Sequence, residues 1–447
     1  MTKINSIINI ILFLLIIHTL LFIFILIKNF NYSLLNLLLL FLFSLIIFFY
    51  IYLIFIKKTF KLNAIVSIIA IYFSIYLFEF YIDTVGTTFK NKKQLDINFD
   101  TRSKIEVIKD FQKNNKIIYP GTYFFDLYED SYFSNLKIYP FAGISNSKTI
   151  SCNELGYWPV ITRDRFGFSN KFDFYEQEID YLLIGDSFAE GWCVNEKDNL
   201  QNILIRNNKK TISLGISGSG PLLQLAILQE YKLLIKPKKI IMMYYEGNDL
   251  KNLYDEINNK ILLKYFNDIN YQQGLSNKQN TIDLFIKKFI KNKYIYRENN
   301  SSDDLTYSNT LYRIIKLSNI RLLINLVSSN DIKSKNSKNN ITIINKYDKI
   351  LNKIKIISNQ LNSELYFIYI PDWTRVKQGK LNDNNLNYKK NIIDLVNKKD
   401  IKIIDFTDKL KKIKDPLSVF PFKKHGHFNK EGYLILNEYI KEITTKK

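Results

Sequence analysis

Histidine and cysteine are scarce in this chain of 447 residues, and their scarcity limits its chemistry. There are 3 histidines and 2 cysteines, and no zinc-finger spacing occurs. His425 and His427 are separated by one residue and have no neighbouring set of carboxylates or thiols, so they make a poor metal site. The sequence therefore predicts no bound metal and no other cofactor.

Acidic residues are in deficit, since 63 Lys and Arg stand against 42 Asp and Glu, giving a net charge of +21. The basic residues are mostly Lys and occur with abundant Ile and Asn, which is typical of codon bias in a low-GC genome. The sequence has no RNA- or DNA-binding signature and no arginine-rich helix. We therefore expect no nucleic-acid partner.

Charged residues are almost missing from three long segments near the N-terminus, Ser6 to Ile27, Leu34 to Ile56 and Leu62 to Ile82. Each is long enough to cross a hydrocarbon core of about 30 Å as a helix. The first is too long for a signal peptide and lacks a small-residue cleavage site. The sequence predicts that residues 1–83 form a three-helix transmembrane anchor whose partner is the lipid bilayer.

Positive charges near the ends of these segments predict the orientation of the anchor. Lys3, Lys57, Lys58 and Lys61 share one side of the membrane if the chain starts inside the cell. Three spans then leave the rest of the chain outside the cytoplasm. Both cysteines, Cys152 and Cys193, belong to that part, and two alternatives stay open for them: a disulfide or two unpaired buried thiols.

The remaining chain divides into an accessory extracytoplasmic segment, 84–178, and a regular α/β region, 179–447. In the second region, helical patterns such as 221–235, 345–361 and 429–443 separate short apolar runs, and the pattern predicts a five-stranded parallel sheet. A helical insertion at about 251–344 is too long for a simple crossover. The five predicted strands are 179–184, 211–214, 239–245, 364–370 and 401–406.

Candidate functional residues follow three of these strands, at the edge of a parallel sheet where reactive groups gather. They are Ser187 after the first strand, Gly218 after the second and Asn248 after the third, and His427 lies near the C-terminus. Each has an ordinary structural explanation when taken alone. A serine that opens a helix is usually a cap, and glycine or asparagine often forms a turn.

Taken in order, the four blocks resemble the SGNH (GDSL-type) hydrolase superfamily, and more loosely a membrane-anchored bacterial subgroup of it. The matching stretches are "IGDSFAEG", "LGISGSGP", "YYEGNDL" and "GHFNKEGY", all within 179–447. The resemblance implies a flavodoxin-like three-layer sandwich that performs acyl-ester chemistry on a serine nucleophile. It also implies a protein of the bacterial inner membrane whose C-terminal domain lies in the periplasm.

The resemblance assigns a role to each block. Ser187 corresponds to the nucleophile and His427 to the general base, and the third histidine, His18, falls inside the first apolar segment. The oxyanion hole corresponds to the backbone N–H groups of Ser187 and Gly218 and the side-chain amide of Asn248.

The sequence departs from the family at the third member of the triad. The family has an aspartate two or three residues before the histidine, where this chain has His425 and Lys424. The alternatives are that Asp415 or Asp405 orients the imidazole, that a backbone carbonyl does so in a Ser-His dyad, or that the site is impaired.

Four further side chains are candidates for substrate contact, and three of them have a simpler alternative. His425, Arg163 and Arg165 would contact substrate, although two loop arginines are more often solvated. Trp192 would stack on a sugar ring or, more commonly for such a residue, pack in the core.

The expected function is a membrane-anchored serine esterase or acyl hydrolase acting on acyl esters, acetyl above all, of envelope glycan or lipid. Two other functions compete with it. One is an O-acyltransferase of cell-surface polysaccharide, which shares the acyl-enzyme. The other is a catalytically inactive relative that binds glycan or serves as a scaffold, for which the missing aspartate is the best support.

Overall fold

The computed structural model describes residues 2–28, 34–92, 99–100, 102–121, 138–300, 314, 317, 320, 337–382, 387–424 and 426–444. The chain forms two compact units. Unit 1 comprises Met1–Asp96 and Ser301–Asn336, and unit 2 comprises Ile97–Asn300 and Ser337–Lys447.

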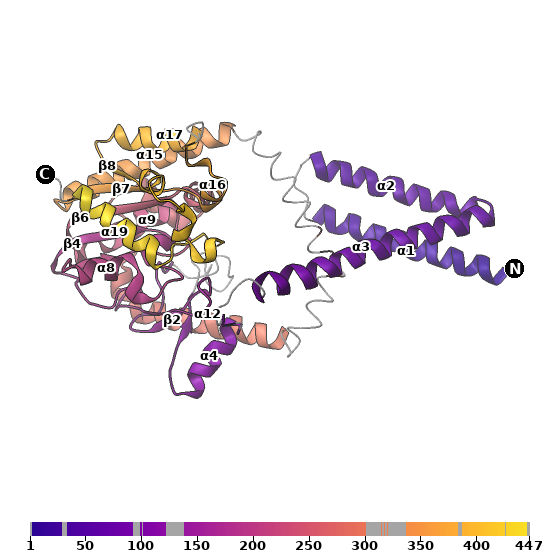
Figure 1. Cartoon of the computed structure of the whole chain (residues 1–447), viewed down its shortest axis with the longest axis horizontal. Coiled ribbons are helices and arrows are strands. Elements are labelled where there is room, and N and C mark those ends of the chain that lie inside the picture. Colours follow the sequence, from indigo (N-terminus) through magenta and orange to yellow (C-terminus); the bar gives the residue numbers. More distant parts are fainter. Residues whose placement is uncertain are drawn as a thin grey trace. The chain divides into compact units, whose positions relative to one another are not determined.

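Three helices make up the described N-terminal part of unit 1: α1 (Thr2–Lys28), α2 (Leu34–Phe55) and α3 (Lys58–Lys92) (Figure 1). Their shared core is small and includes Leu12, Leu53 and Ile65. Most of their other apolar side chains are exposed, which is unfavourable in water and favourable in lipid.

The prediction of three membrane spans is wrong in number for the part of the chain that the structure describes. There, one helical stretch, Phe60–Ile82, is long and apolar enough to cross a membrane. Ile8–Leu20 and Leu40–Phe55 are apolar helical runs of 10–17 residues.

Unit 2 is a mixed α/β structure around a five-stranded sheet in which every strand is parallel to its neighbours, as the sequence predicted. The order is β5-β4-β6-β7-β8, so that β4 and β6 lie in the interior of the sheet. The strands are β4 (Glu178–Gly185), β5 (Thr211–Ser213), β6 (Lys236–Tyr245), β7 (Glu364–Ile370) and β8 (Lys402–Asp405).

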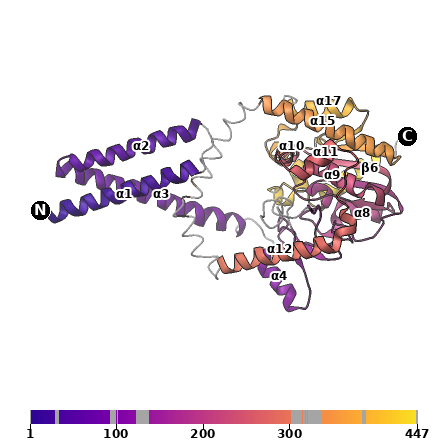
Figure 2. The same cartoon turned by 180° about the vertical axis from the view of Figure 1, so that it is seen from behind.

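Helices cover both faces of this sheet, which explains why its strands are apolar runs rather than alternating patterns. Alternate residues belong to two separate cores: Leu182 and Ile240 lie in one, Leu183 and Ile241 in the other. The first face is covered by α9 (Pro221–Tyr231), α11 (Lys260–Asn267) and α15 (Ser337–Gln360) (Figure 2). The second is covered by α8 (Leu200–Arg206), α18 (Phe406–Leu410) and α19 (Lys430–Thr444) (Figure 1).

A second, small sheet lies in the segment that precedes β4. It has the order β1-β2-β3, with β1 parallel and β3 antiparallel to β2. Aromatic residues of the same segment, Phe141 and Phe168, are buried in the first core of the large sheet. The small sheet consists of β1 (Tyr119–Pro120), β2 (Lys148–Ile150) and β3 (Val160–Thr162).

Further helices complete unit 2 and connect these layers. The α-helices are α4 (Lys104–Lys113), α7 (Ser187–Glu190), α10 (Asp249–Glu256), α12 (Gln279–Asn300), α16 (Trp373–Lys377) and α17 (Asn387–Asn397). The 3-10 turns are η1 (Glu196–Asp198), η2 (Lys232–Leu234), η3 (Leu275–Lys278), η4 (Lys380–Asn382), η5 (Pro416–Val419) and η6 (Pro421–Lys423).

Candidate active site

Ser187 is the first residue of the short helix α7, immediately beyond the carboxyl end of β4. The preceding residue, Asp186, caps this helix, because its carboxylate accepts a hydrogen bond from the backbone N–H of Phe188 at 3.0 Å. Gly185 has φ +154°, and a Cβ there would lie 2.8 Å from the carbonyl oxygen of Met243. The capping group of α7 is thus the carboxylate of Asp186. The hydroxyl of Ser187 contacts a different residue.

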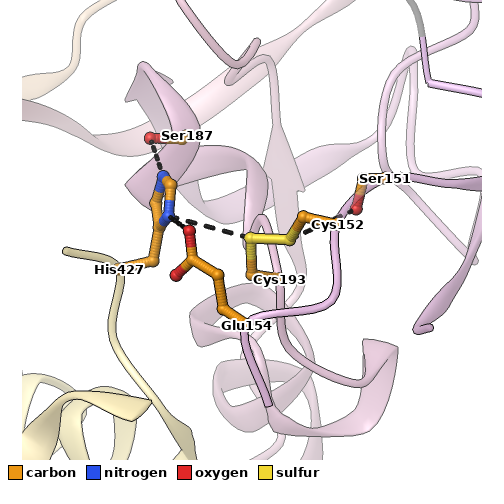
Figure 3. The surroundings of a disulfide bond; sticks show 6 residues. All are labelled: Ser151, Cys152, Glu154, Ser187, Cys193 and His427. Atoms are coloured by element: carbon orange, nitrogen blue, oxygen red, sulfur yellow. Dashed lines mark hydrogen bonds and ion pairs between the residues drawn. A yellow bond between two sulfur atoms is a disulfide. The ribbon is translucent and has the colours of Figure 1, made fainter. Parts of the chain in front are cut away.

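That partner is His427, whose imidazole lies between Ser187 and a carboxylate. The Nε2 atom of His427 lies 3.0 Å from the Oγ atom of Ser187, and its Nδ1 atom lies 2.8 Å from the Oε1 atom of Glu154 (Figure 3). The hydroxyl of Ser187 lies farther, 3.4 Å, from the carboxylate of Asp186. Serine, imidazole and carboxylate thus form a hydrogen-bonded series in the order that nucleophilic catalysis requires.

Glu154 is the residue that the sequence did not indicate. It lies in the loop between β2 and β3, ahead of all five strands of the large sheet. The two acids that the sequence offered have other partners. Asp415 caps η5 and lies 2.5 Å from the Nζ atom of Lys423, and Asp405 caps α18 and lies 2.5 Å from the Nζ atom of Lys389.

One sequence signal does point to Glu154. It follows Cys152 by two positions, and Cys152 forms a disulfide with Cys193, which follows Ser187 by six. Of the alternatives for the two cysteines, the structure contains the disulfide. A disulfide between the two cysteines brings the segment of Glu154 beside the segment of Ser187.

The charges around His427 adjust its proton affinity. Burial alone would lower the pKa of the imidazole, but the hydrogen bond and charge of Glu154, with the charges of Asp186 and Glu190, outweigh burial and hold it above 6.5. Burial raises the pKa of Asp186 to about 6. A raised pKa makes the imidazole a stronger base for taking the proton of a serine hydroxyl.

Gly218 lies in the loop after β5, with φ +81°, where glycine is favoured over other residues. The space where its Cβ would be is open, with no atom within 4 Å. Two hydrogen bonds fix this loop to the turn at Ser187. The hydroxyl of Ser219 donates to the carbonyl of Gly185 at 3.0 Å, and the backbone N–H of Ser217 donates to the carboxylate of Glu190 at 2.6 Å.

Asn248 precedes α10 at the carboxyl end of β6 and is half-buried. Its side chain caps no backbone N–H of that helix, and it hydrogen-bonds the carboxylate of Asp186 instead. An asparagine amide has two N–H donors, so this contact leaves one for another acceptor. Asp186 therefore connects the turn at Ser187 with the carboxyl end of β6.

The two arginines proposed as substrate contacts have protein partners. Arg163 is buried, with its guanidinium 2.7 Å from the carboxylate of Glu190 and its Nε donating to the hydroxyl of Thr149 at 2.9 Å. Glu190 also accepts the N–H of Ser217, next to Gly218. Arg163 therefore holds the carboxylate that fixes the loop of Gly218. Arg165 pairs with Asp173 and Glu176 at the surface.

Two other candidates from the sequence remain. Trp192 is buried and packs against Gly121, where an added Cβ would lie 2.9 Å from the indole ring. His425 lies outside the described residues.

Among the described residues, one group has the composition of a metal site, namely Cys152, Cys193 and Glu154. The two sulfur atoms are bonded to each other, so they are not thiolates and would not bind a metal ion. The third member is the carboxylate that contacts His427. This group is better described as part of the serine-histidine arrangement.

Two comparisons with known proteins found no match for this chain. No protein-family model matches it, and no curated protein matches it. The geometry of the site and the residue pattern in the sequence are therefore the basis for any statement about function.

Proposed function

We propose that this chain is a membrane-anchored serine esterase of the SGNH type, which hydrolyses small acyl esters, acetyl above all, of envelope glycan or lipid. One observation carries the proposal: Ser187, His427 and Glu154 form a hydrogen-bonded series at the carboxyl edge of a parallel sheet. Gly218 and Asn248 follow the neighbouring strands, in the order that the SGNH resemblance implies.

In the first half of the reaction, the Oγ atom of Ser187 attacks the ester carbonyl carbon while the Nε2 atom of His427 takes its proton. Glu154 keeps the other ring nitrogen protonated and stabilises the imidazolium that forms. The oxyanion accepts hydrogen bonds from the N–H groups of Ser187 and Gly218 and from the second N–H of Asn248. The alcohol then leaves with the proton from His427, and an acyl-serine remains.

In the second half, a hydroxyl compound attacks the acyl-serine with the same base. Water gives hydrolysis, and a sugar hydroxyl gives O-acyl transfer. The two reactions share every residue named here, so we take hydrolysis as the proposed activity and transfer as an outcome to be measured.

The location and the substrate class follow from the anchor and the charge. The apolar helices of unit 1 would hold unit 2 at the outer face of a bacterial inner membrane, in the periplasm. The net charge of +21 would favour an anionic glycan or lipid headgroup over a neutral substrate. A disulfide beside the site agrees with an oxidising compartment.

The competing function, an inactive glycan-binding or scaffold protein, loses its main support in this structure. It depended on the missing aspartate before His427. Glu154 occupies the position of an orienting acid, at 2.8 Å from Nδ1. A binding module has no need for a nucleophile, a base and an acid in hydrogen-bonded series.

The test is hydrolysis of p-nitrophenyl acetate by the full-length chain in detergent, beside Ser187→Ala and His427→Ala. We expect turnover in the parent protein and none above the uncatalysed rate in either variant. A fluorophosphonate probe should label the parent protein and not Ser187→Ala. A folded parent protein that neither hydrolyses the ester nor reacts with the probe would contradict the proposal.

A further inference from the structure

The disulfide Cys152–Cys193 joins the two segments that carry the acid and the nucleophile of the triad. Its Cα atoms are 5.3 Å apart, and the two cysteines are separated by 41 positions in the sequence. Cys152 lies in the loop that carries Glu154, and Cys193 lies in the turn that leaves the helix of Ser187. The covalent bond therefore connects chain segments on either side of the imidazole.

The disulfide also lies against the imidazole itself. The Sγ atom of Cys193 is 3.7 Å from the Nδ1 atom of His427, the same atom that contacts Glu154 at 2.8 Å (Figure 3). Cys193 is completely buried, so the sulfur fills space beside the ring. The carboxylate and the sulfur together limit where this edge of the ring can lie.

Most other polar contacts of the Glu154 loop lead away from the nucleophile, but the side chain of Tyr157 hydrogen-bonds the backbone of Asn195, two residues after Cys193. The side chain of Asn153 donates to the carbonyl of Asp100 at 2.5 Å, and the carbonyl of Gly156 accepts the N–H of Asp100 at 2.7 Å. The indole of Trp158 donates to the carbonyl of Arg102. The bonds to Asp100 and Arg102 fix the loop on one side, whereas the disulfide, beside the contact of Tyr157, fixes it covalently to the turn after Ser187.

We propose that the Cys152–Cys193 disulfide is a positioning element of the triad, which holds the carboxylate of Glu154 against His427. This inference rests on the proposed function. Breaking the bond removes the covalent attachment of the Glu154 loop to the turn after Ser187 and leaves the contact of Tyr157 with Asn195 on that side, while Ser187 stays at the start of α7. A displacement of about 1 Å in a catalytic group can cost about 10²-fold in rate.

Reduction of the Cys152–Cys193 disulfide is an ordinary thiol–disulfide exchange. A dithiol attacks one sulfur through its thiolate, forms a mixed disulfide, and then closes to its own disulfide. Two electrons and two protons pass to the protein, which gains the thiols of Cys152 and Cys193. The oxidised form would be the active one, which confines the activity to an oxidising compartment.

Two pairs of full-length proteins in detergent test the inference. The first pair is the parent protein and Cys152→Ala/Cys193→Ala, which leaves no thiol beside His427. The second pair carries the same substitutions in a Glu154→Ala background. Steady-state hydrolysis of p-nitrophenyl acetate gives kcat and KM for each protein.

We expect loss of the disulfide to lower kcat by about 10²-fold in the parent background with little change in KM. In the Glu154→Ala background the same change should alter kcat by less than about twofold, because the group that the disulfide positions is already absent. An equal loss in both backgrounds would mean that the disulfide acts on the fold in general. Unchanged kcat in the parent background would mean that other contacts suffice to hold Glu154.

A readout that does not depend on activity separates this inference from the proposed function. The groups that face the imidazole with a negative charge are Glu154, Asp186 and Glu190, and Glu154 has the largest influence of the three. Histidine NMR is simple in a chain with 3 histidines. If the disulfide holds Glu154 in place, its removal lowers the pKa of His427, as Glu154→Ala does.

An unchanged pKa would overturn the inference even in an active esterase. A lowered pKa in a protein without turnover would instead overturn the proposed function and leave the inference standing. If the double variant fails to fold, reduction of the parent protein by a dithiol, followed by reoxidation, gives the same comparison in one sample. Recovery of the original pKa after reoxidation excludes denaturation as the cause.

Discussion

Replacing Glu154 with glutamine should disable the site while leaving its shape almost unchanged. Glutamine has the same size but is neutral, and its NH₂ group is a donor. It can donate to the Nδ1 atom of His427 and so favour the tautomer with the proton on Nε2. In that tautomer, Nε2 cannot take the proton of Ser187, which lies 3.0 Å away.

The size of the effect follows from the charge that is lost. At an effective dielectric constant of about 20, a carboxylate 2.8 Å from an imidazolium contributes about 6 kcal/mol. This is an upper limit, because the side chains of His427 and Glu154 are 24% and 21% exposed to solvent. In serine proteases, amide replacement of the triad acid lowers kcat by about 10⁴, or about 5.4 kcal/mol. We expect a loss of about 10²–10⁴ in kcat with little change in KM.

The assay is ester hydrolysis by full-length protein, with Asp415→Asn and Asp405→Asn as matched controls. Both controls remove one carboxylate from an acid that pairs with a lysine away from the imidazole. They should keep activity close to that of the parent protein. Activity that survives in Glu154→Gln but disappears in either control would refute the assignment of the acid.

Three other outcomes are expected. Activity should rise with pH as His427 loses its proton, with a midpoint above pH 6.5 in the parent protein. The midpoint should be lower in Glu154→Gln, because the pKa of the imidazole falls when the carboxylate charge is removed. Measurement of kcat/KM across pH checks this, and equal midpoints would contradict it. Asn248→Ala should lower kcat by about 10²–10³ and leave KM little changed, as expected for an oxyanion donor; a change confined to KM would assign Asn248 to substrate binding. Arg163→Met should lower the free energy of unfolding by about 3–5 kcal/mol, because it leaves the carboxylate of Glu190 buried without its ion pair. Urea unfolding measures this, and a loss below about 1 kcal/mol would refute the reasoning.

The architecture of the sheet could be predicted from the sequence because each strand is buried on both faces. Runs such as residues 239–245 and 364–370 are apolar without alternation, which indicates a covered parallel strand. The positions of Ser187, Gly218 and Asn248 follow from that prediction, since parallel strands present their carboxyl ends at one edge. The membrane prediction differs from the structure in the number of spans, since Phe60–Ile82 is the one stretch of the described residues that is long and apolar enough to cross a membrane.

The orienting acid was not predictable in the same way. Asp405 and Asp415 are near His427 in the sequence, but separation along the chain has no fixed relation to distance in space. Glu154 reaches the imidazole from a loop of the small sheet, 273 positions away. The prediction that Arg163 contacts substrate or solvent failed for a related reason. Its partner, Glu190, lies in α7, a different segment of the chain.

The most direct measurement is the site of the covalent intermediate. Full-length protein in detergent is mixed with a slowly hydrolysed acyl ester, quenched in acid and digested, and the modified peptide is identified by mass spectrometry. An acyl group on Ser187, absent from His427→Ala treated in the same way, is the result that we expect. Turnover of the ester without an adduct on Ser187, or an adduct on another nucleophile, would contradict the proposed mechanism.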